Sequence, residues 1–363
     1  MATPDGYAGT ASLALTTDPG LEDVVVHELR ALVGDAPRFD AQVRPDARAG
    51  HVTVEVGMPQ ATLEALALRL RSVHHVVRPL LRFELPAEDP LGCVQRTVAS
   101  VAASIPELAP ADVTFRVTSA RSGTHPFTSE DVQRVAGAGV RDVLARAVRM
   151  KGADVDLRCD VRGSDVLLGV RLTRVALSRR SPGAYRPHTS LRANVAWSML
   201  ALARLEYPPR VLLDPFVGGG TILSEAAARW PDVRLCGSDQ QPRCVDGVTA
   251  NLAEAGLASR ATLRVGDARH LDALWPDEQF DLIVTNPPFG ERLGSDVDFG
   301  ALYRAFLGGC ADRSTDDARM VVLVSRRGDF NRALRAVGRW ETRHVRMIEV
   351  GGLFVGVFVL SRI

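Results

Sequence analysis

Lysine is almost absent from this chain, because Lys151 is alone among 44 lysine and arginine residues. The five cysteines are scattered, without a CxxC pair or any other zinc-ligand spacing, so we expect reduced thiols and no metal centre. The first residues are polar and lack the apolar stretch of a secretion signal. The longest apolar run, from Leu353 to Leu360, is far too short to cross a bilayer. We therefore expect a cytoplasmic protein without a membrane partner, and no pattern indicates an obligate protein partner.

Length and charge narrow the class of protein further. With 363 residues, 46% of them hydrophobic and 24% charged, the chain suits a globular protein of two or three domains. The net charge of +1 is uneven: it is −6 through Phe115, +8 from Arg116 to Arg192 and −1 beyond. A basic block between acidic ones is what an RNA-binding surface needs, since neutralised phosphates supply sequence-independent affinity. On charge alone, a solvated arginine surface explains the block equally well.

The first half of the chain alternates short strand patterns with helical ones. A hairpin closes this half, with its turn at Arg162–Asp165. The order coarsely resembles a ferredoxin-like βαβ sandwich followed by a second α+β unit. Residues 178–190, with two prolines, a glycine and no periodicity, are expected to form a linker. We expect strands at 12–17, 51–57, 76–85 and from 113, and helices at 20–32, 59–70, 93–103 and 129–148.

The second half has a different pattern. After a helix expected at 191–205, five short, continuous apolar runs alternate with helical stretches. Continuous apolar strands separated by helices predict a parallel sheet covered on both faces. The last two strand patterns meet across Gly351-Gly352, which predicts a terminal antiparallel hairpin.

Polar residues follow the predicted parallel strands at their carboxyl ends, where such sheets bind ligands. Asp214 opens a glycine-rich turn, DPFVGGGT, while Asp239, Asp267 and Asn286 end the next three strands. Asp239 stands at the distance at which an acid meets ribose hydroxyls, and Asp267 can accept from an adenine amino group. The dinucleotide fingerprint lacks its third glycine, and Asp214 would repel a pyrophosphate but suits an ammonium group. S-adenosyl-L-methionine, which has an ammonium group and no phosphate, is therefore favoured over NAD.

From Val211 to Asn286 the chain resembles the class I methyltransferases, with the matching positions in the expected order. The resemblance implies that Asp214 and the glycines lie against the methionine part of the cofactor. It also implies that Asp239 holds the ribose, and Asp267 with Ala268 the adenine. The predicted cofactor-binding residues are Asp214, Phe216, Gly218, Gly220, Thr221, Asp239, Asp267, Ala268 and Asn286.

The tetrapeptide Asn286-Pro-Pro-Phe289 is the most specific signal in the chain and matches the amino-methyltransferase pattern (Asn/Asp)-Pro-Pro-(Tyr/Phe). An exocyclic amine is a poor nucleophile because its lone pair is delocalised into the ring. The Asn286 side-chain oxygen and the Pro287 carbonyl can accept its two N–H groups and direct the lone pair at the methyl group. The prolines stiffen the loop, and Phe289 can stack on the base. Adenine, guanine and glutamine amides all remain candidate substrates.

Residues 114–140 resemble a THUMP domain, whose family members bind the single-stranded 3′ end of tRNA. The match rests on the strand Phe115-Arg116-Val117, the turn His125-Pro126-Phe127-Thr128-Ser129 and a helix that Ser129 would cap. The family's lysine-rich turn is replaced here by Arg121-Ser122-Gly123, and His125 and Phe127 also suit a core. The predicted RNA-binding residues are Arg116, Arg121, His125, Arg134, Lys151 and Arg186.

Together these motifs resemble the THUMP-containing tRNA guanine-N2 methyltransferases. The resemblance implies an α/β chain whose C-terminal Rossmann-like class I methyltransferase sheet ends in an antiparallel hairpin, preceded by α+β ferredoxin-like and THUMP domains. We expect a ferredoxin-like domain at 1–72, a THUMP domain at 73–177, a linker at 178–190 and a methyltransferase domain at 191–363. The expected substrate is the tRNA acceptor stem, at position 6. A position-10 enzyme, an rRNA enzyme, a protein-glutamine methyltransferase and an inactive RNA-binding protein remain alternatives.

Overall fold

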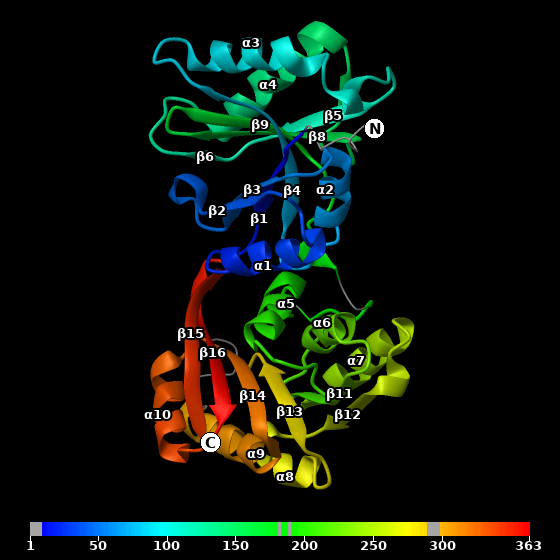
Figure 1. Ribbon diagram of the computed structural model, residues 1–363, viewed down its shortest axis with the longest axis vertical. Helices are drawn as coiled ribbons and strands as arrows, with labels where there is room; N and C mark the ends of the chain where they lie inside the picture. Colours follow the sequence, from blue (N-terminus) through cyan, green and yellow to red (C-terminus); the bar gives the residue numbers. More distant parts are fainter. Residues whose placement is uncertain (1–8, 181–182, 188–189, 289–297) are drawn as a thin grey trace, which may run out of the picture.

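The computed structural model describes residues 9–180, 183–187, 190–288 and 298–363. Two β-sheets, each with its own helices, stack along the long axis of the molecule (Figure 1). The first sheet belongs to the N-terminal half and the second to the C-terminal half. Within the described residues, no helix is long and apolar enough to cross a membrane.

The first sheet has nine strands, eight of them in the order β2-β3-β1-β4-β9-β8-β5-β7, with β6 paired to β8. The long strand β4 pairs with β1 on one side and with β9 on the other, so the expected ferredoxin-like and THUMP units share one continuous sheet. The strands are β1 (Ala11–Thr16), β2 (Phe39–Val43), β3 (His51–Val56), β4 (His75–Glu84), β5 (Thr114–Thr118), β6 (Arg121–Ser122), β7 (Ala147–Val148), β8 (Val155–Arg162) and β9 (Asp165–Arg171).

Four helices cover this sheet in two pairs. The apolar sides of α1 (Glu22–Val33) and α2 (Gln60–Ala67) pack on the β1–β3 part. The other pair, α3 (Pro90–Ala102) and α4 (Ser129–Leu144), packs together on the β5–β8–β9 part. Each pair closes its own buried apolar cluster, because alternate side chains of the strands face it.

Two local predictions for this half were wrong, and strand β2 was missed. The cap of α4 is Thr128 and not Ser129: Thr128 Oγ1 accepts from the Asp131 amide at 3.1 Å, and Asp131 Oδ2 accepts from the Thr128 amide at 2.9 Å. This reciprocal capping box satisfies two donors at once. The helix ends at Leu144 rather than near Val148, because Ala145 turns to φ 48° and β7 follows. Strand β2 was not expected, although its residues FDAQV alternate apolar and polar, and most of them are exposed.

The second sheet has seven strands in the order β12-β11-β10-β13-β14-β16-β15. The first five are parallel, β16 runs antiparallel to β14, and β15 runs antiparallel to β16. The predicted Rossmann-like sheet and its hairpin at Gly351-Gly352 are confirmed. The strands are β10 (Val211–Asp214), β11 (Arg234–Asp239), β12 (Ala261–Val265), β13 (Phe280–Thr285), β14 (Ser314–Val324), β15 (Trp340–Val350) and β16 (Leu353–Arg362).

Helices cover both faces of this sheet, as its continuous apolar strands require. One buried cluster joins the sheet to α5 (Ala193–Leu202), α6 (Thr221–Arg229) and α7 (Pro242–Glu254). The other joins it to α8 (Leu271–Leu274), α9 (Phe299–Asp312) and α10 (Arg327–Val337). Because these helices lie on the two faces, they leave the carboxyl ends of the parallel strands uncovered, and this end of the sheet is the edge referred to below.

Candidate active site

Three predicted site residues meet at this edge because their strands are neighbours. Strand β10 lies between β11 and β13, so Asp214 at its end stands between Asp239 and Asn286. The chain leaves β10 toward β11 on one side, while β13 lies on the other. This reversal of strand order is where open parallel sheets bind ligands.

The glycine-rich turn after β10 brings backbone close to its surroundings. Gly218 and Gly220 adopt positive φ angles of 50° and 75°. A Cβ atom on Gly219 would lie 2.4 Å from Ser190 Oγ, and one on Gly220 would lie 2.7 Å from Val248 Cγ1. Thr221 follows as the first residue of α6. Side chains are thus excluded at Gly219 and Gly220, and α6 begins directly after the turn.

Asp214 is buried, with an exposed fraction of 1%. Its Oδ1 accepts hydrogen bonds from Thr285 Oγ1 at 2.7 Å and from the Phe216 amide at 3.2 Å. Burial raises the pKa of Asp214 to about 7, against the effect of these two hydrogen bonds. The sequence analysis missed Thr285, although its place directly before Asn286 on β13 is a signal for it.

Asp239 and the glycine turn are joined directly. Asp239 accepts from the Gly218 amide at 3.1 Å and from the Gln241 amide at 2.9 Å. These bonds fix the carboxylate at the end of β11, where a ribose would approach it. Phe216, in the same turn, packs edge-on against Phe306 with 5.5 Å between ring centroids.

Asp267 and Ala268 follow β12, one strand further from Asn286. Asp267 caps the short 3-10 helix Ala268–His270 by accepting from the Arg269 amide at 2.9 Å. Its carboxylate also pairs with the Arg269 guanidinium at 2.5 Å, which lowers the pKa of Asp267. Asp267 is therefore already bound within its own loop, and Ala268 is buried beside it.

Asn286 presents an acceptor that the described part of the chain leaves unused. Its Oδ1 is buried from solvent and has no hydrogen-bond partner there. A buried amide oxygen without a partner is costly, so such a group is ordinarily matched by a ligand or by water. Pro287, which follows, is buried. Phe289 lies outside the described residues, and its proposed stacking role stays a prediction.

The expected linker packs against the catalytic half. The Tyr185 amide donates to Asn251 Oδ1 at 3.0 Å, and Asn251 Nδ2 donates back to the Tyr185 carbonyl at 2.8 Å. The Tyr185 ring covers Gly247, where a Cβ atom would lie 2.2 Å from its Cγ. This part of the linker is thus fixed on α7, next to the cofactor turn.

The predicted RNA-binding residues are spread over the N-terminal half and the linker. Arg116 on β5 pairs with Asp156 at 2.5 Å, and Asp156 also pairs with Arg171 at 3.1 Å. One carboxylate thus serves two guanidinium groups and leaves an excess positive charge. The Arg116 guanidinium also donates to the Met150 carbonyl at 3.2 Å, which places the exposed Lys151 nearby.

The other four predicted RNA-binding residues have surroundings of their own. Arg121 lies on β6 and donates to the Gly123 carbonyl at 3.1 Å. His125 contacts the Ser122 carbonyl at 3.0 Å, and its ring lies 4.9 Å from that of Phe127. Arg134 on α4 and Arg186 in the linker are exposed. Their contact with RNA stays a prediction.

Comparison with known proteins identifies both halves. The THUMP domain model matches residues 98–171, and the model described as RMKL-like, methyltransferase domain, matches residues 183–355. A tRNA (guanine(6)-N2)-methyltransferase of Thermus thermophilus is 39% identical over 97% of this chain and 99% of that protein. The Homo sapiens tRNA (guanine(6)-N(2))-methyltransferase THUMP3 is 31% identical over 77% of this chain and 56% of that protein.

Solved structures agree with the fold. The crystal structure of TrmN from Thermus thermophilus has a TM-score of 0.83 and 36% identity, and the match covers 98% of this chain and 100% of that one. SMU.472, a putative methyltransferase complexed with SAH, has a TM-score of 0.77 at 19% identity, with 96% and 97% covered. The second likeness concerns the fold alone.

Proposed function

The chain belongs to the THUMP-domain family of tRNA guanine-N2 methyltransferases, and we propose that it forms N2-methylguanosine at position 6 of the tRNA acceptor stem. It is an RNA guanine-N2-methyltransferase of the class I fold. The methyl donor in this proposal is S-adenosyl-L-methionine, and the compartment is the cytoplasm. The observation that carries the proposal is the unpartnered Asn286 Oδ1 beside the buried pair Asp214–Thr285.

The chain's own residues account for each task of the reaction. Asp214 supports the proposed donor, because a buried carboxylate suits the ammonium group of its methionine part. Asp239 would accept from the ribose hydroxyls. Asn286 Oδ1 and the Pro287 carbonyl would hold the two N–H groups of the guanine amine and direct its lone pair. S-adenosyl-L-methionine supplies the electrophilic methyl group when bound.

Mass spectrometry of nucleosides from the RNA substrates and of the intact peptide tests the proposed function. Unmodified tRNA transcripts, an rRNA fraction and a glutamine-bearing peptide would each be incubated with the enzyme and S-adenosyl-L-methionine. We expect N2-methylguanosine in tRNA alone, at position 6 when digestion fragments are mapped. Product at position 10, in rRNA or on glutamine would replace the proposal with the corresponding alternative.

Replacing Asp239 with alanine is expected to weaken binding of S-adenosylhomocysteine by about 1–3 kcal/mol. The carboxylate is held by the Gly218 and Gln241 amides, so its loss removes the ribose acceptor and leaves these two donors unmatched. Calorimetry with the full chain measures the effect. Asp272→Ala, a change in the short helix α8, is the matched control and should bind as the wild type does. Wild-type affinity in Asp239→Ala would exclude the ribose role.

Binding of S-adenosylhomocysteine should strengthen as pH rises toward 7. Burial raises the pKa of Asp214 to about 7, so the carboxyl is neutral below that pH and must lose a proton to meet an ammonium group. Affinity should rise by up to about tenfold per pH unit between pH 5.5 and 7 and then level off. The same raised pKa means that this group's contribution to folding stability without ligand falls as pH rises from about 4 to 7.

Asp214→Asn distinguishes this coupling from other titrations. The amide can still accept from Thr285 Oγ1 but never carries the charge. We expect weaker binding with a flat pH profile over the same range. An unchanged pH slope in Asp214→Asn would assign the titration to another group.

A further inference from the structure

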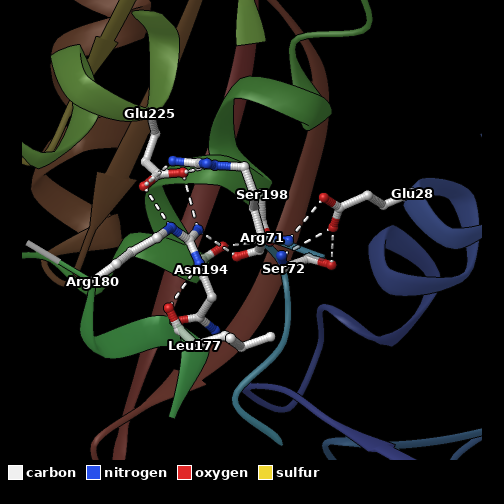
Figure 2. A network of polar contacts seen from close by, with 8 residues as sticks. All are labelled: Glu28, Arg71, Ser72, Leu177, Arg180, Asn194, Ser198 and Glu225. Carbon is white, nitrogen blue, oxygen red and sulfur yellow. Dashed lines mark hydrogen bonds and ion pairs between the residues drawn. The ribbon is translucent and has the colours of Figure 1, made fainter. Parts of the chain in front are cut away.

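A buried carboxylate of the catalytic half receives two arginines from outside that half. Glu225 lies on α6 with an exposed fraction of 2%. Arg71 donates to it through Nε at 2.8 Å and Nη2 at 3.2 Å, and Arg180 through Nε at 2.9 Å and Nη2 at 3.0 Å. Figure 2 shows both guanidinium groups turned toward this one side chain. Both pairs are bidentate, the geometry in which arginine and carboxylate bind most strongly.

The two arginines are themselves fixed on the N-terminal side. Glu28 on α1 accepts from the Arg71 and Ser72 amides, both at 2.9 Å. Arg180 donates to the Arg71 carbonyl at 2.7 Å and to the Leu177 carbonyl at 2.8 Å. A continuous polar network therefore runs from α1 through the turn before β4 to α6 (Figure 2). Arg71 and Glu225, which the network joins, are 154 positions apart in sequence, so this contact is independent of the covalent connection between the halves.

Two further contacts surround this network. Asp18, after β1, accepts from Arg192 Nη1 at 2.9 Å and from Asn194 Nδ2 at 2.8 Å at the start of α5. Asp23 on α1 pairs with Arg346 on β15 at 2.8 Å. Asp18 thus contacts the start of α5, and Asp23 contacts the terminal hairpin. The tip of this hairpin lies at the same end of the sheet as Asn286.

Packing alone does not hold the side of the joint on which Glu225 lies. A cavity of about 1380 Å³ opens there, lined by apolar groups of both halves and by Arg71, Trp197 and Arg229. The Arg71 guanidinium lies 5.4 Å from the Trp197 ring centroid.

Leu21 and Val24 pack against α5 next to this cavity, and the ion pairs at Glu225 add directional contacts where the packing is incomplete. Glu225 is buried while Arg71 and Arg180 are partly exposed, so replacing Glu225 frees two guanidinium groups that can turn toward solvent and releases the joint at this point.

We propose that Glu225 is a positioning residue that fixes the N-terminal half, and through its continuous sheet the THUMP unit, relative to the carboxyl ends of the parallel strands (the catalytic edge). It thereby sets which guanosine reaches Asn286. The inference rests on the proposed function, in which the THUMP unit holds the tRNA 3′ end. A fixed separation between two sites on one rigid body selects a nucleotide by its distance along the stem. A joint that can rotate lets neighbouring nucleotides reach the catalytic edge.

The test maps the methylated position in acceptor stems with a guanosine at each of positions 5, 6 and 7. The wild-type enzyme should methylate one position, while Glu225→Gln should raise the product at the neighbouring guanosines about tenfold, as a coupling of about 1.4 kcal/mol would. Arg71→Gln should have a similar effect, and the double variant should add little to either. Cofactor affinity should be unchanged in all three, because Glu225 faces away from the glycine turn and toward Arg71 and Arg180.

Glu278→Gln is the matched control. It breaks a bidentate pair with Arg234 that lies entirely within the catalytic half. It should lower the melting temperature without changing the methylated position. If Glu225→Gln lowers stability but keeps single-site methylation, the residue is structural only and the proposal is overturned.

A distance measurement decides the matter independently of activity. Cys93 is half-buried while the other four cysteines are buried, so a spin label on Cys93 can be paired with one on Ala258→Cys in the catalytic half. The wild-type interlabel distribution should be narrow, and Glu225→Gln should broaden or shift it. An unchanged distribution would overturn the proposal. If the wild-type enzyme forms no N2-methylguanosine, the proposed function fails, and this distance measurement still shows whether Glu225 fixes the joint.

Discussion

Replacing Asn286 with alanine is expected to reduce the single-turnover rate of methyl transfer by about a thousandfold or more. The Asn286 Oδ1 is a buried acceptor without a partner in the described residues, so its proposed partner is the target amine. Without it the amine loses one of the two contacts that direct its lone pair toward the methyl group. Affinity for S-adenosylhomocysteine should stay close to the wild-type value, because the effect falls on the chemical step.

Asn286→Asp is the informative companion variant. Aspartate is the other residue of the tetrapeptide pattern and keeps an acceptor at this position, so it should retain more activity than alanine. Rapid-quench measurement with saturating tRNA and cofactor separates the chemical step from product release. A wild-type rate in Asn286→Ala would remove this side chain from the mechanism and leave the Pro287 carbonyl as the remaining acceptor.

The sequence could place the candidate cofactor site because its signals are local. Asp214, Asp239 and Asn286 each end an apolar strand, and a parallel sheet necessarily brings such ends to one edge. The order of the strands then makes the three residues neighbours. What the sequence could not show is the state of each group. Asp214 is buried and bonded to Thr285, and Asp267 is already paired with Arg269.

The joint between the halves was beyond prediction for a different reason. In the sequence, Glu225 is an acid in the middle of a helix, where a solvated face is the ordinary expectation. Arg71 and Arg180 belong to a turn and to the start of the predicted linker. Only the tertiary arrangement brings these three charges together. The sequence indicated only a linker at 178–190 between the halves, whereas the observed contacts that join them directly lie mostly outside it.

Local competition explains the smaller errors in the N-terminal half. Thr128 and Ser129 are both residue types that cap helices well. Thr128 is the cap because Asp131, three residues later, accepts a hydrogen bond from its amide. Strand β2 alternates apolar and polar residues over only five positions and most of its side chains are exposed, so its pairing with β3 is what defines it. The continuous sheet through β4 likewise depends on pairing partners that are nearly a hundred residues apart.

Removing the unpaired 3′ nucleotides of the tRNA is expected to depress methylation by about tenfold to a hundredfold, although the target guanosine is untouched. The THUMP unit carries Arg116 and Lys151 beside an excess positive charge, which suits the phosphates of an unpaired strand. A target guanosine that is no longer held in position can lose about a hundredfold in rate. In the proposed function, the contacts at Asp18, Asp23 and Glu225 hold the N-terminal half in place, and the 3′ end would be the reference point for the catalytic edge. Intact and trimmed transcripts would be compared under single-turnover conditions at saturating enzyme, so that simple loss of affinity is compensated. If the N-terminal half adds only nonspecific affinity, the trimmed tRNA will be methylated as fast as the intact one at saturation, and selection by distance from the 3′ end will be wrong.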